Sequence, residues 1–236
     1  QNGAMRVVVL TGAGISAESG VRTFRDSGGL WEGHDVADVA TPEGFARDPE
    51  LVQRFYDARR RAVREARPNA AHRALARLEA ALEDDLLVVT QNVDDLHERA
   101  GSQRVVHMHG ELRRARCQAC HHRPAWDDDL VDAPPCPACG ERALRPDVVW
   151  FGEVPYELDR IADAVSSCDL FVSVGTSGSV YPAAGYVALA ASSGASTLEL
   201  NLEPSEVAHV FDEVRTGPAA ELVPEWVDEL IGAPTR

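Results

Sequence analysis

The chain has 236 residues, of which 44% are hydrophobic and 26% charged, values close to those of ordinary soluble proteins. This length fits one large α/β domain, or one domain with an insertion, and no apolar run is long enough to cross a bilayer, which excludes a transmembrane protein. With 38 acidic and 23 basic residues the formal net charge is -15, which repels phosphate backbones and anionic lipids. We therefore expect neither nucleic acid nor a membrane as a partner.

The first four residues, Gln-Asn-Gly-Ala, precede a methionine and lack the charged and apolar regions of a signal peptide. We interpret residues 1–4 as a remnant of an expression vector and consider the fold from Met5 onward. Without an export signal, we expect a cytoplasmic protein whose cysteines stay reduced.

Short apolar runs and amphipathic stretches alternate along the chain. The apolar runs predict strands over 6–10, 86–90, 104–107, 170–174 and 197–200. Apolar residues at helical spacing predict helices over 49–66, 70–82, 181–193 and 224–231. Strands that alternate with helices are typical of a doubly wound parallel sheet, so we predict a Rossmann-like α/β fold. The long helical stretch between the first two strands indicates an insertion.

A glycine turn, Gly12-Ala13-Gly14, follows the first predicted strand. Such a turn lets the backbone approach a pyrophosphate, which the start of the next helix then binds. A simple structural turn has the same pattern, so the motif alone leaves both interpretations open. An ordinary dehydrogenase has an acidic residue at the end of its second strand, about twenty residues after the glycine turn, and this residue binds the ribose. The chain has no such residue there, which argues against an ordinary dehydrogenase. Asn201 and Glu203, after a later strand, are candidates for that contact.

Four of the five cysteines have the spacing Cys-x2-Cys-x15-Cys-x2-Cys. Two tight pairs of thiolates suit one tetrahedral zinc ion, and this spacing favours a metal over unligated core cysteines. Four sulfur ligands leave no open coordination position, so the zinc is expected to be structural. The predicted ligands are Cys117, Cys120, Cys136 and Cys139. Cys168 stands alone and is interpreted as a small buried hydrophobe.

Polar clusters follow three of the predicted strands, at the end of a parallel sheet where ligands bind. They are residues 91–94 (Gln-Asn-Val-Asp), 107–110 (His-Met-His-Gly) and 175–177 (Gly-Thr-Ser). Each cluster has a purely structural alternative: Asn92 or Asp94 could cap a helix that begins near Asp95, and either histidine could be a core residue.

Taken together, the motifs resemble the sirtuin family of NAD-dependent protein lysine deacylases over nearly all of residues 5–232. The resemblance rests on 12–20, 23–25 (Thr-Phe-Arg), 90–94, Leu96-His97, His109-Gly110, 175–177, 201–203 and 217–219. It implies that NAD contacts Gly12, Ala13, Gly14, Ser16, Glu18, Arg25, Gln91, Asn92, Asp94, Gly175, Thr176, Ser177, Asn201, Glu203 and Ala219.

The resemblance also implies the chemistry. In this family the acyl-lysine amide oxygen attacks C1′ of the nicotinamide ribose, nicotinamide leaves, and the 2′-oxygen captures the acyl carbon. His109 would be the general base toward the ribose hydroxyls, and Asn92 would orient ribose and water. The products would be nicotinamide, O-acyl-ADP-ribose and free lysine.

The family's architecture implies a discontinuous NAD-binding domain, formed by 5–31, 85–110 and 148–236. A smaller lobe would contain a helical insertion, 32–84, and a zinc module, 111–147. An acylated protein segment would bind in extended form between the lobes, where backbone hydrogen bonds supply affinity with little sequence selectivity. The implied substrate contacts are Val148, Phe151, Gly152 and Val180.

The pattern Ala40-x15-Tyr56-x2-Arg59 bears on the acyl group. Tyr56 and Arg59 are three residues apart on a predicted helix, so both side chains can enter one pocket. The alternative is that Tyr56 is a core residue and Arg59 belongs to a solvated arginine run. The pattern resembles the sirtuin subgroup that removes succinyl and malonyl groups, in which a small residue widens the pocket and Tyr and Arg bind the acyl carboxylate.

Other functions share parts of these motifs. An NAD-dependent oxidoreductase would use the glycine turn but not His109 or the zinc module. A zinc-ribbon module for nucleic acid would use the cysteines, although the charge of -15 disfavours it. Within the resemblance, protein ADP-ribosylation is a possible side activity. We expect a monomer that acts on acylated lysine in proteins.

Overall fold

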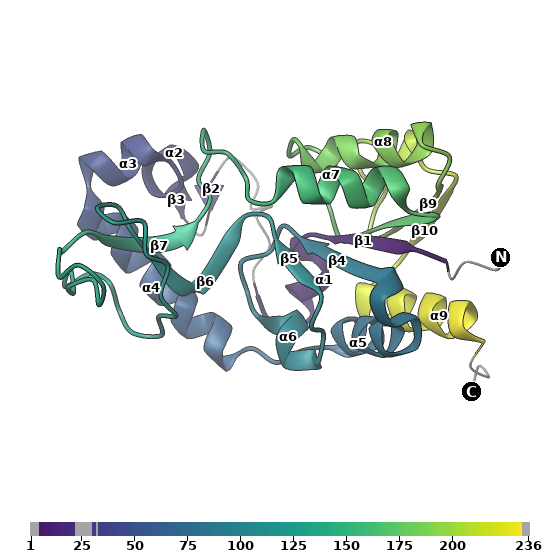
Figure 1. Cartoon of the computed structure of the whole chain (residues 1–236), viewed down its shortest axis with the longest axis horizontal. Helices are drawn as coiled ribbons and strands as arrows, with labels where there is room; N and C mark the ends of the chain where they lie inside the picture. The colour runs from purple at the N-terminus through teal and green to yellow at the C-terminus, as the bar shows by residue number, and fades with distance from the viewer. Residues whose placement is uncertain (1–4, 22–29, 32, 233–236) are drawn as a thin grey trace.

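The computed structural model describes residues 5–21, 30–31 and 33–232. Two lobes lie side by side in it, and the larger lobe contains a parallel sheet covered by helices on both faces (Figure 1). The predicted doubly wound α/β fold is confirmed. No helix within the described ranges combines the length and the apolar character that a membrane span requires.

The sheet of the larger lobe has six strands in the order β10-β9-β8-β1-β4-β5, and every pairing is parallel. The strands are β1 (Val7–Thr11), β4 (Leu86–Thr90), β5 (Val105–His107), β8 (Leu170–Val174), β9 (Ser196–Asn201) and β10 (Glu213–Thr216). The β1 and β4 strands are buried along their whole length, as expected for strands covered on both faces. Five of the six strands were predicted, and β10 was not.

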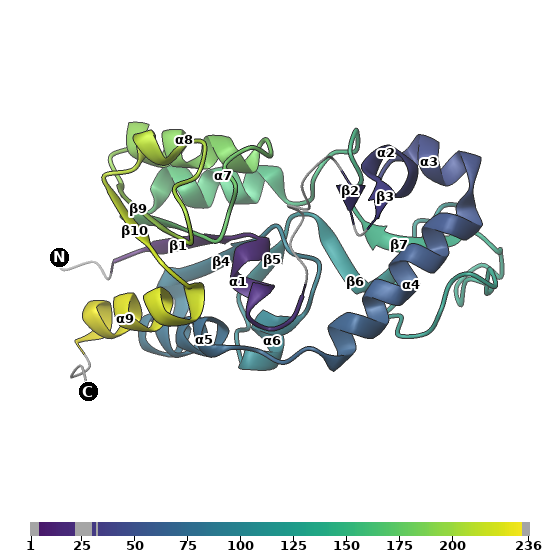
Figure 2. The same ribbon diagram turned by 180° about the vertical axis from the view of Figure 1, so that it is seen from behind.

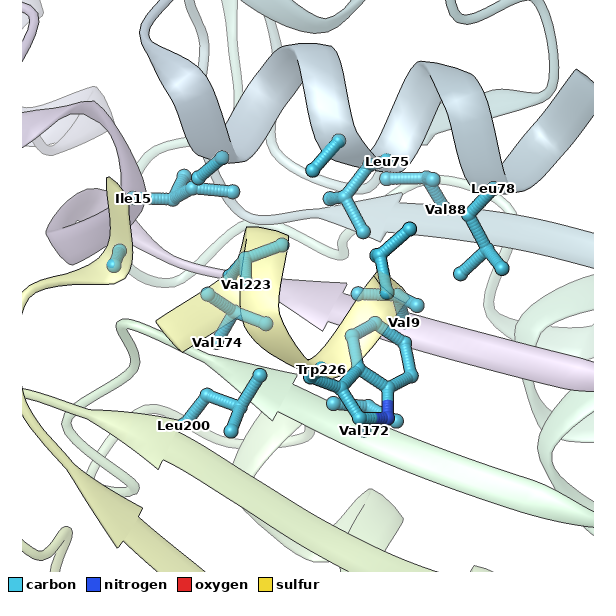
Figure 3. Packing of buried hydrophobic residues seen from close by; sticks show 14 of the residues in the cluster. Val9, Ile15, Leu75, Leu78, Val88, Val172, Val174, Leu200, Val223 and Trp226 are labelled. Atoms are coloured by element: carbon cyan, nitrogen blue, oxygen red, sulfur yellow. The ribbon is translucent and has the colours of Figure 1, made fainter. Parts of the chain in front are cut away.

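Helices α5 (Ala70–Leu82) and α9 (Ala219–Ile231) pack against each other on one face of the sheet. Their core contains, among others, Val9, Leu75, Val88, Val172, Val223 and Trp226, which point toward one another in Figure 3. The predicted start of α9 at Pro224 was wrong, because this proline lies inside the helix rather than in its first turn.

The opposite face of the sheet is covered by α7 (Leu158–Ser167) and α8 (Tyr186–Ser192). The sequence did not predict α7. The helix predicted over 181–193 begins only at Tyr186, because residues 183–185 form a 3-10 turn. Short elements complete this lobe: α1 (Ala13–Ala17), α6 (Leu96–Ala100) and the 3-10 turns Glu83–Asp85 and Ala208–Val210.

The smaller lobe contains helices and two antiparallel pairs of strands. Its elements are β2 (Leu30–Trp31), β3 (His34–Asp35), α2 (Val36–Val39), α3 (Pro42–Arg47), α4 (Pro49–Glu65), β6 (Gly110–Cys117) and β7 (Leu144–Val148). Val52, Phe55 and Tyr56 of α4 form its core with Leu112 and Trp150.

The two long helices predicted within residues 32–84 contact different lobes. Figure 2 shows α4 along the smaller lobe, whereas α5 lies with α9 under the large sheet. The chain therefore crosses between the lobes just after α4.

Candidate active site

A cavity of about 1440 Å³ lies between the lobes, at the carboxyl ends of the strands. It is lined by the predicted cofactor residues Gly12, Ala13, Gly14, Ser16, Glu18, Gln91, Asn92, Asp94, Gly175, Thr176, Ser177, Asn201 and Ala219. The other lining residues include His109 and the predicted substrate residues Ala40, Tyr56, Arg59, Val148, Phe151, Gly152 and Val180. The exposed Glu203 is not among the lining residues, although both its chain neighbours are, and Arg25 lies outside the described residues.

The glycine turn after β1 packs tightly against the end of β8. A Cβ atom on Gly14 would lie 2.7 Å from the Cα of Gly175, and Gly175 itself has a φ of +62°. The Gly14 amide donates to the Gly175 carbonyl at 2.9 Å. Because neither position has room for a side chain, the two turns form a backbone cradle, which suits close approach by a pyrophosphate.

A buried hydrogen-bond network holds the polar side chains beside this cradle. Asn92 Nδ2 donates to Ser16 Oγ at 3.1 Å, and Ser16 Oγ donates to Asp94 Oδ2 at 3.0 Å. Burial raises the pKa of the Asp94 carboxyl, while its hydrogen bonds oppose the shift. Asp94 Oδ1 also accepts from the Leu96 amide at the start of α6. Asp94 therefore both bonds to the helix start, as the structural alternative expected, and lines the cavity.

The structure gives a physical basis for distinguishing the two histidines, of which the resemblance implied only His109 as the base. His109 Nδ1 lies 3.1 Å from the Gln91 carbonyl oxygen, which can only accept, so Nδ1 carries the proton and Nε2 keeps its lone pair. Burial lowers the pKa of His109, and the bond to Gln91 opposes this only in part. The ring is therefore neutral near pH 7, and Nε2 can accept a proton from a ligand.

His107 has a different environment. Its Nε2 lies 2.7 Å from Glu98 Oε1, and its Nδ1 lies 3.2 Å from the Asn92 carbonyl oxygen. Burial opposes protonation, but the Glu98 carboxylate outweighs it and raises the pKa of His107. Since both nitrogens have protein partners and the residue does not line the cavity, His107 lacks what a base for a bound ligand requires.

The predicted acyl-group residues come together in one wall of the cavity. Tyr56 and Arg59 of α4 are both buried, and the Arg59 guanidinium carbon lies 3.9 Å from the centroid of the Trp31 ring. The Phe151 amide donates to the Ala40 carbonyl at 2.9 Å, which fixes Ala40 in the same wall. The alternative of a solvated Arg59 is wrong, because the helix turns this side chain inward. Tyr56 does belong to the core, as that alternative held, and it reaches the cavity as well.

A buried ion pair lies on α4 beside these residues. Arg60 Nη1 lies 2.6 Å from Asp57 Oδ1, and both side chains are about 1% exposed. Asp57 accepts from the Leu130 amide of the cysteine-rich segment, and Arg60 donates to the Leu112 and Asp128 carbonyls. These bonds connect α4 with the segment between β6 and β7.

The four predicted zinc ligands converge in that segment. Their sulfur atoms all lie within 4.8 Å of one another, and the residues are Cys117, Cys120, Cys136 and Cys139. Four thiolates at this separation fit a tetrahedral zinc ion with no open position for substrate. Cys168 is buried in the other lobe, as the sequence indicated.

We expect one zinc ion per chain, and we expect its removal by a chelator to unfold the segment between β6 and β7 and abolish turnover. Activity falls indirectly, because Asp57 and Arg60 on α4 lose their partners at Leu130 and Asp128. Elemental analysis, circular dichroism and turnover before and after chelation measure this. Cys168→Ser is the matched control and should retain zinc. Active purified protein without zinc would contradict the prediction.

Comparison with known proteins gives close relatives across the whole chain. A family model described as the Sir2 family matches residues 12–182. An NAD-dependent protein deacylase of Escherichia coli (strain K12) is 58% identical over 229 residues, covering 96% of this chain and 82% of that protein. The protein of the same description from Pasteurella multocida (strain Pm70) is 56% identical over 230 residues, covering 96% and 98%.

Solved structures of Sir2 proteins also resemble this chain in fold. A Sir2 homologue in complex with NAD superposes with a TM-score of 0.89 at 41% identity, covering 97% of this chain and 90% of that one. A Sir2 protein with a deacetylated p53 peptide and 3′-O-acetyl ADP-ribose has a TM-score of 0.83 at 30% identity, covering 95% and 93%. Because the family model, the sequence identity to these relatives and the shared fold all agree, the chain belongs to the Sir2 family.

Proposed function

We propose that this chain removes succinyl and malonyl groups from lysine in preference to acetyl groups. Its general activity is that of an NAD-dependent protein deacylase, as in its Sir2 relatives. The observation that carries the preference is the pair Tyr56 and Arg59 in one wall of the cavity that also contains His109.

The charge of the cavity wall supports an acidic acyl group. Among the described residues that line the cavity, Arg59 is the only arginine, and it lies on the wall formed by the smaller lobe. A guanidinium fork binds a carboxylate through two charge-assisted hydrogen bonds, for which a neutral acetyl group has no equivalent. Ala40 adds little volume to the same wall and leaves room for a longer acyl chain.

The side chains around the cradle have different roles in the proposed reaction. Bound NAD would supply the ribose C1′ for attack by the acyl oxygen and the 2′-oxygen that would receive the acyl group. His109 Nε2 takes the proton from a ribose hydroxyl. Ser16 holds Asn92 and Asp94 in fixed orientation, so that they can orient ribose and water. Glu203 and Arg25 remain proposed cofactor contacts.

We also infer the organisation and setting of the enzyme. The proposed division has an NAD-binding domain of 5–31, 85–110 and 148–236, a helical insertion of 32–84 and a zinc module of 111–147. Within it, α5 and the 3-10 turn after it are reassigned to the NAD-binding domain, because α5 packs on the large sheet. β2, Val148 and Trp150 are reassigned to the smaller lobe, where they pair or pack. The chain acts as a cytoplasmic monomer on acylated lysine in proteins, and its net charge of -15 disfavours nucleic acid or anionic membranes as partners.

A turnover assay with NAD and matched acetyl-, succinyl- and malonyl-lysine peptides tests this proposal. We expect nicotinamide release that requires the acylated peptide, with a higher kcat/KM on the two acidic substrates. Equal or faster deacetylation would reject the acyl preference. Reduction of NAD in place of nicotinamide release would favour an oxidoreductase, and label transfer from NAD to protein would indicate ADP-ribosylation.

A further inference from the structure

The hydroxyl group of Tyr56 has a hydrogen-bond partner just after β7, next to the predicted substrate residue Phe151. Trp150, two residues after β7, is buried, and its Nε1 lies 3.0 Å from Tyr56 Oη. An indole N–H can only donate, so the Tyr56 oxygen is the acceptor. The Tyr56 O–H therefore points away from Trp150, and the part of the chain that the structure describes shows no acceptor for its proton.

The indole ring of Trp150 is held in place. The Arg145 guanidinium carbon lies 3.8 Å from the ring centroid, and the Phe45 ring lies 5.1 Å away. Arg145, itself buried, donates to Glu153 Oε2 at 2.7 Å, and the Trp150 amide donates to the same oxygen at 2.9 Å. With ring and backbone both anchored, the indole N–H stays directed at Tyr56.

We propose that Trp150 is a positioning residue for acyl selectivity, which directs the Tyr56 hydroxyl proton into the cavity toward the carboxylate of an acidic acyl group. This inference rests on the succinyl and malonyl preference proposed above. A hydrogen bond donated to the Tyr56 oxygen also polarises its O–H and strengthens it as a donor. Acetyl-lysine has only a methyl group at this position and gains nothing from the arrangement.

The variant Trp150→Phe tests this, because phenylalanine keeps an aromatic ring against Arg145 but lacks the N–H. We expect the ratio of kcat/KM for succinyl-lysine over acetyl-lysine to fall about 3- to 10-fold, the size of one net hydrogen bond. The loss should lie mainly in the KM for the succinyl peptide, since the contact exists before and during the reaction. A cooperative thermal unfolding transition will show whether the variant folds.

Tyr56→Phe and the double variant complete the test. Tyr56→Phe removes the donor itself, so adding Trp150→Phe to it should leave the ratio unchanged. If Trp150→Phe does not fold, Tyr56→Phe carries the test, and an unchanged ratio there overturns the inference.

The possible outcomes separate this inference from the function on which it rests. A wild-type preference for succinyl-lysine that Trp150→Phe leaves intact overturns the role of Trp150 alone, as does a further fall of the ratio in the double variant. A wild-type ratio near one overturns the acyl preference and the role of Trp150 together.

Discussion

Replacement of His109 by alanine is expected to lower kcat/KM for any acylated peptide about 100-fold to 10,000-fold, the usual cost of losing a general base. The reason is that Nε2 of this neutral, half-buried imidazole faces the ligand cavity while Nδ1 is held by Gln91. Steady-state release of nicotinamide measures the loss. Circular dichroism and zinc content should match those of the wild type, because no zinc ligand is touched.

His107→Ala is the matched control for this variant. It removes a histidine two residues away whose nitrogens are bonded to Glu98 and the Asn92 carbonyl. We expect a much smaller loss, through a less firmly held Asn92. A His109→Ala enzyme with near-normal turnover, beside a His107→Ala enzyme without activity, would reverse the two assignments.

The variant Arg59→Met is expected to lower kcat/KM for succinyl-lysine about 10-fold to 150-fold and to affect acetyl-lysine far less. The guanidinium lost here would give two charge-assisted hydrogen bonds, worth about 1.5 to 3 kcal/mol, to an acyl carboxylate. Methionine keeps much of the aliphatic bulk that packs beside Trp31. Parallel assays on the two peptides measure the ratio.

Arg61→Met serves as the control on the same helix. Arg61 is exposed and pairs with Asp129 on the surface, so its loss should change neither substrate. Equal losses on both substrates for Arg59→Met would show instead that Arg59 supports the packing of Trp31 and Phe55, whose rings its guanidinium covers.

The sequence predicts the central sheet because its strands are covered on both faces and are therefore apolar throughout. It fails for β10, since Glu213–Thr216 forms an exposed edge strand without an apolar run. It also fails for α7, whose cap position is taken by Glu157 with a φ of +58° and no side-chain cap, so the usual start signal is missing.

The candidate site was predictable where its residues follow strands, because parallel strands bring their carboxyl ends to one edge. The zinc ligands were predictable from spacing alone. The resemblance assigned His109 rather than His107, but the physical reason was not predictable, since it depends on which carbonyl and carboxylate each ring contacts. Nor was the bond from Trp150 to Tyr56, two residues 94 positions apart that only the folded smaller lobe brings together.

The position of β1 in the middle of the sheet has a consequence for biosynthesis. This strand is synthesised before both of its neighbours, residues 86–90 and 170–174. At about 5 to 20 residues per second, β1 waits on the order of ten seconds before its second neighbour exists. During that time an apolar strand has unpaired backbone groups, the state in which nascent chains aggregate. The run that marks β1 in the sequence is thus also a segment prone to aggregate while the chain is being made.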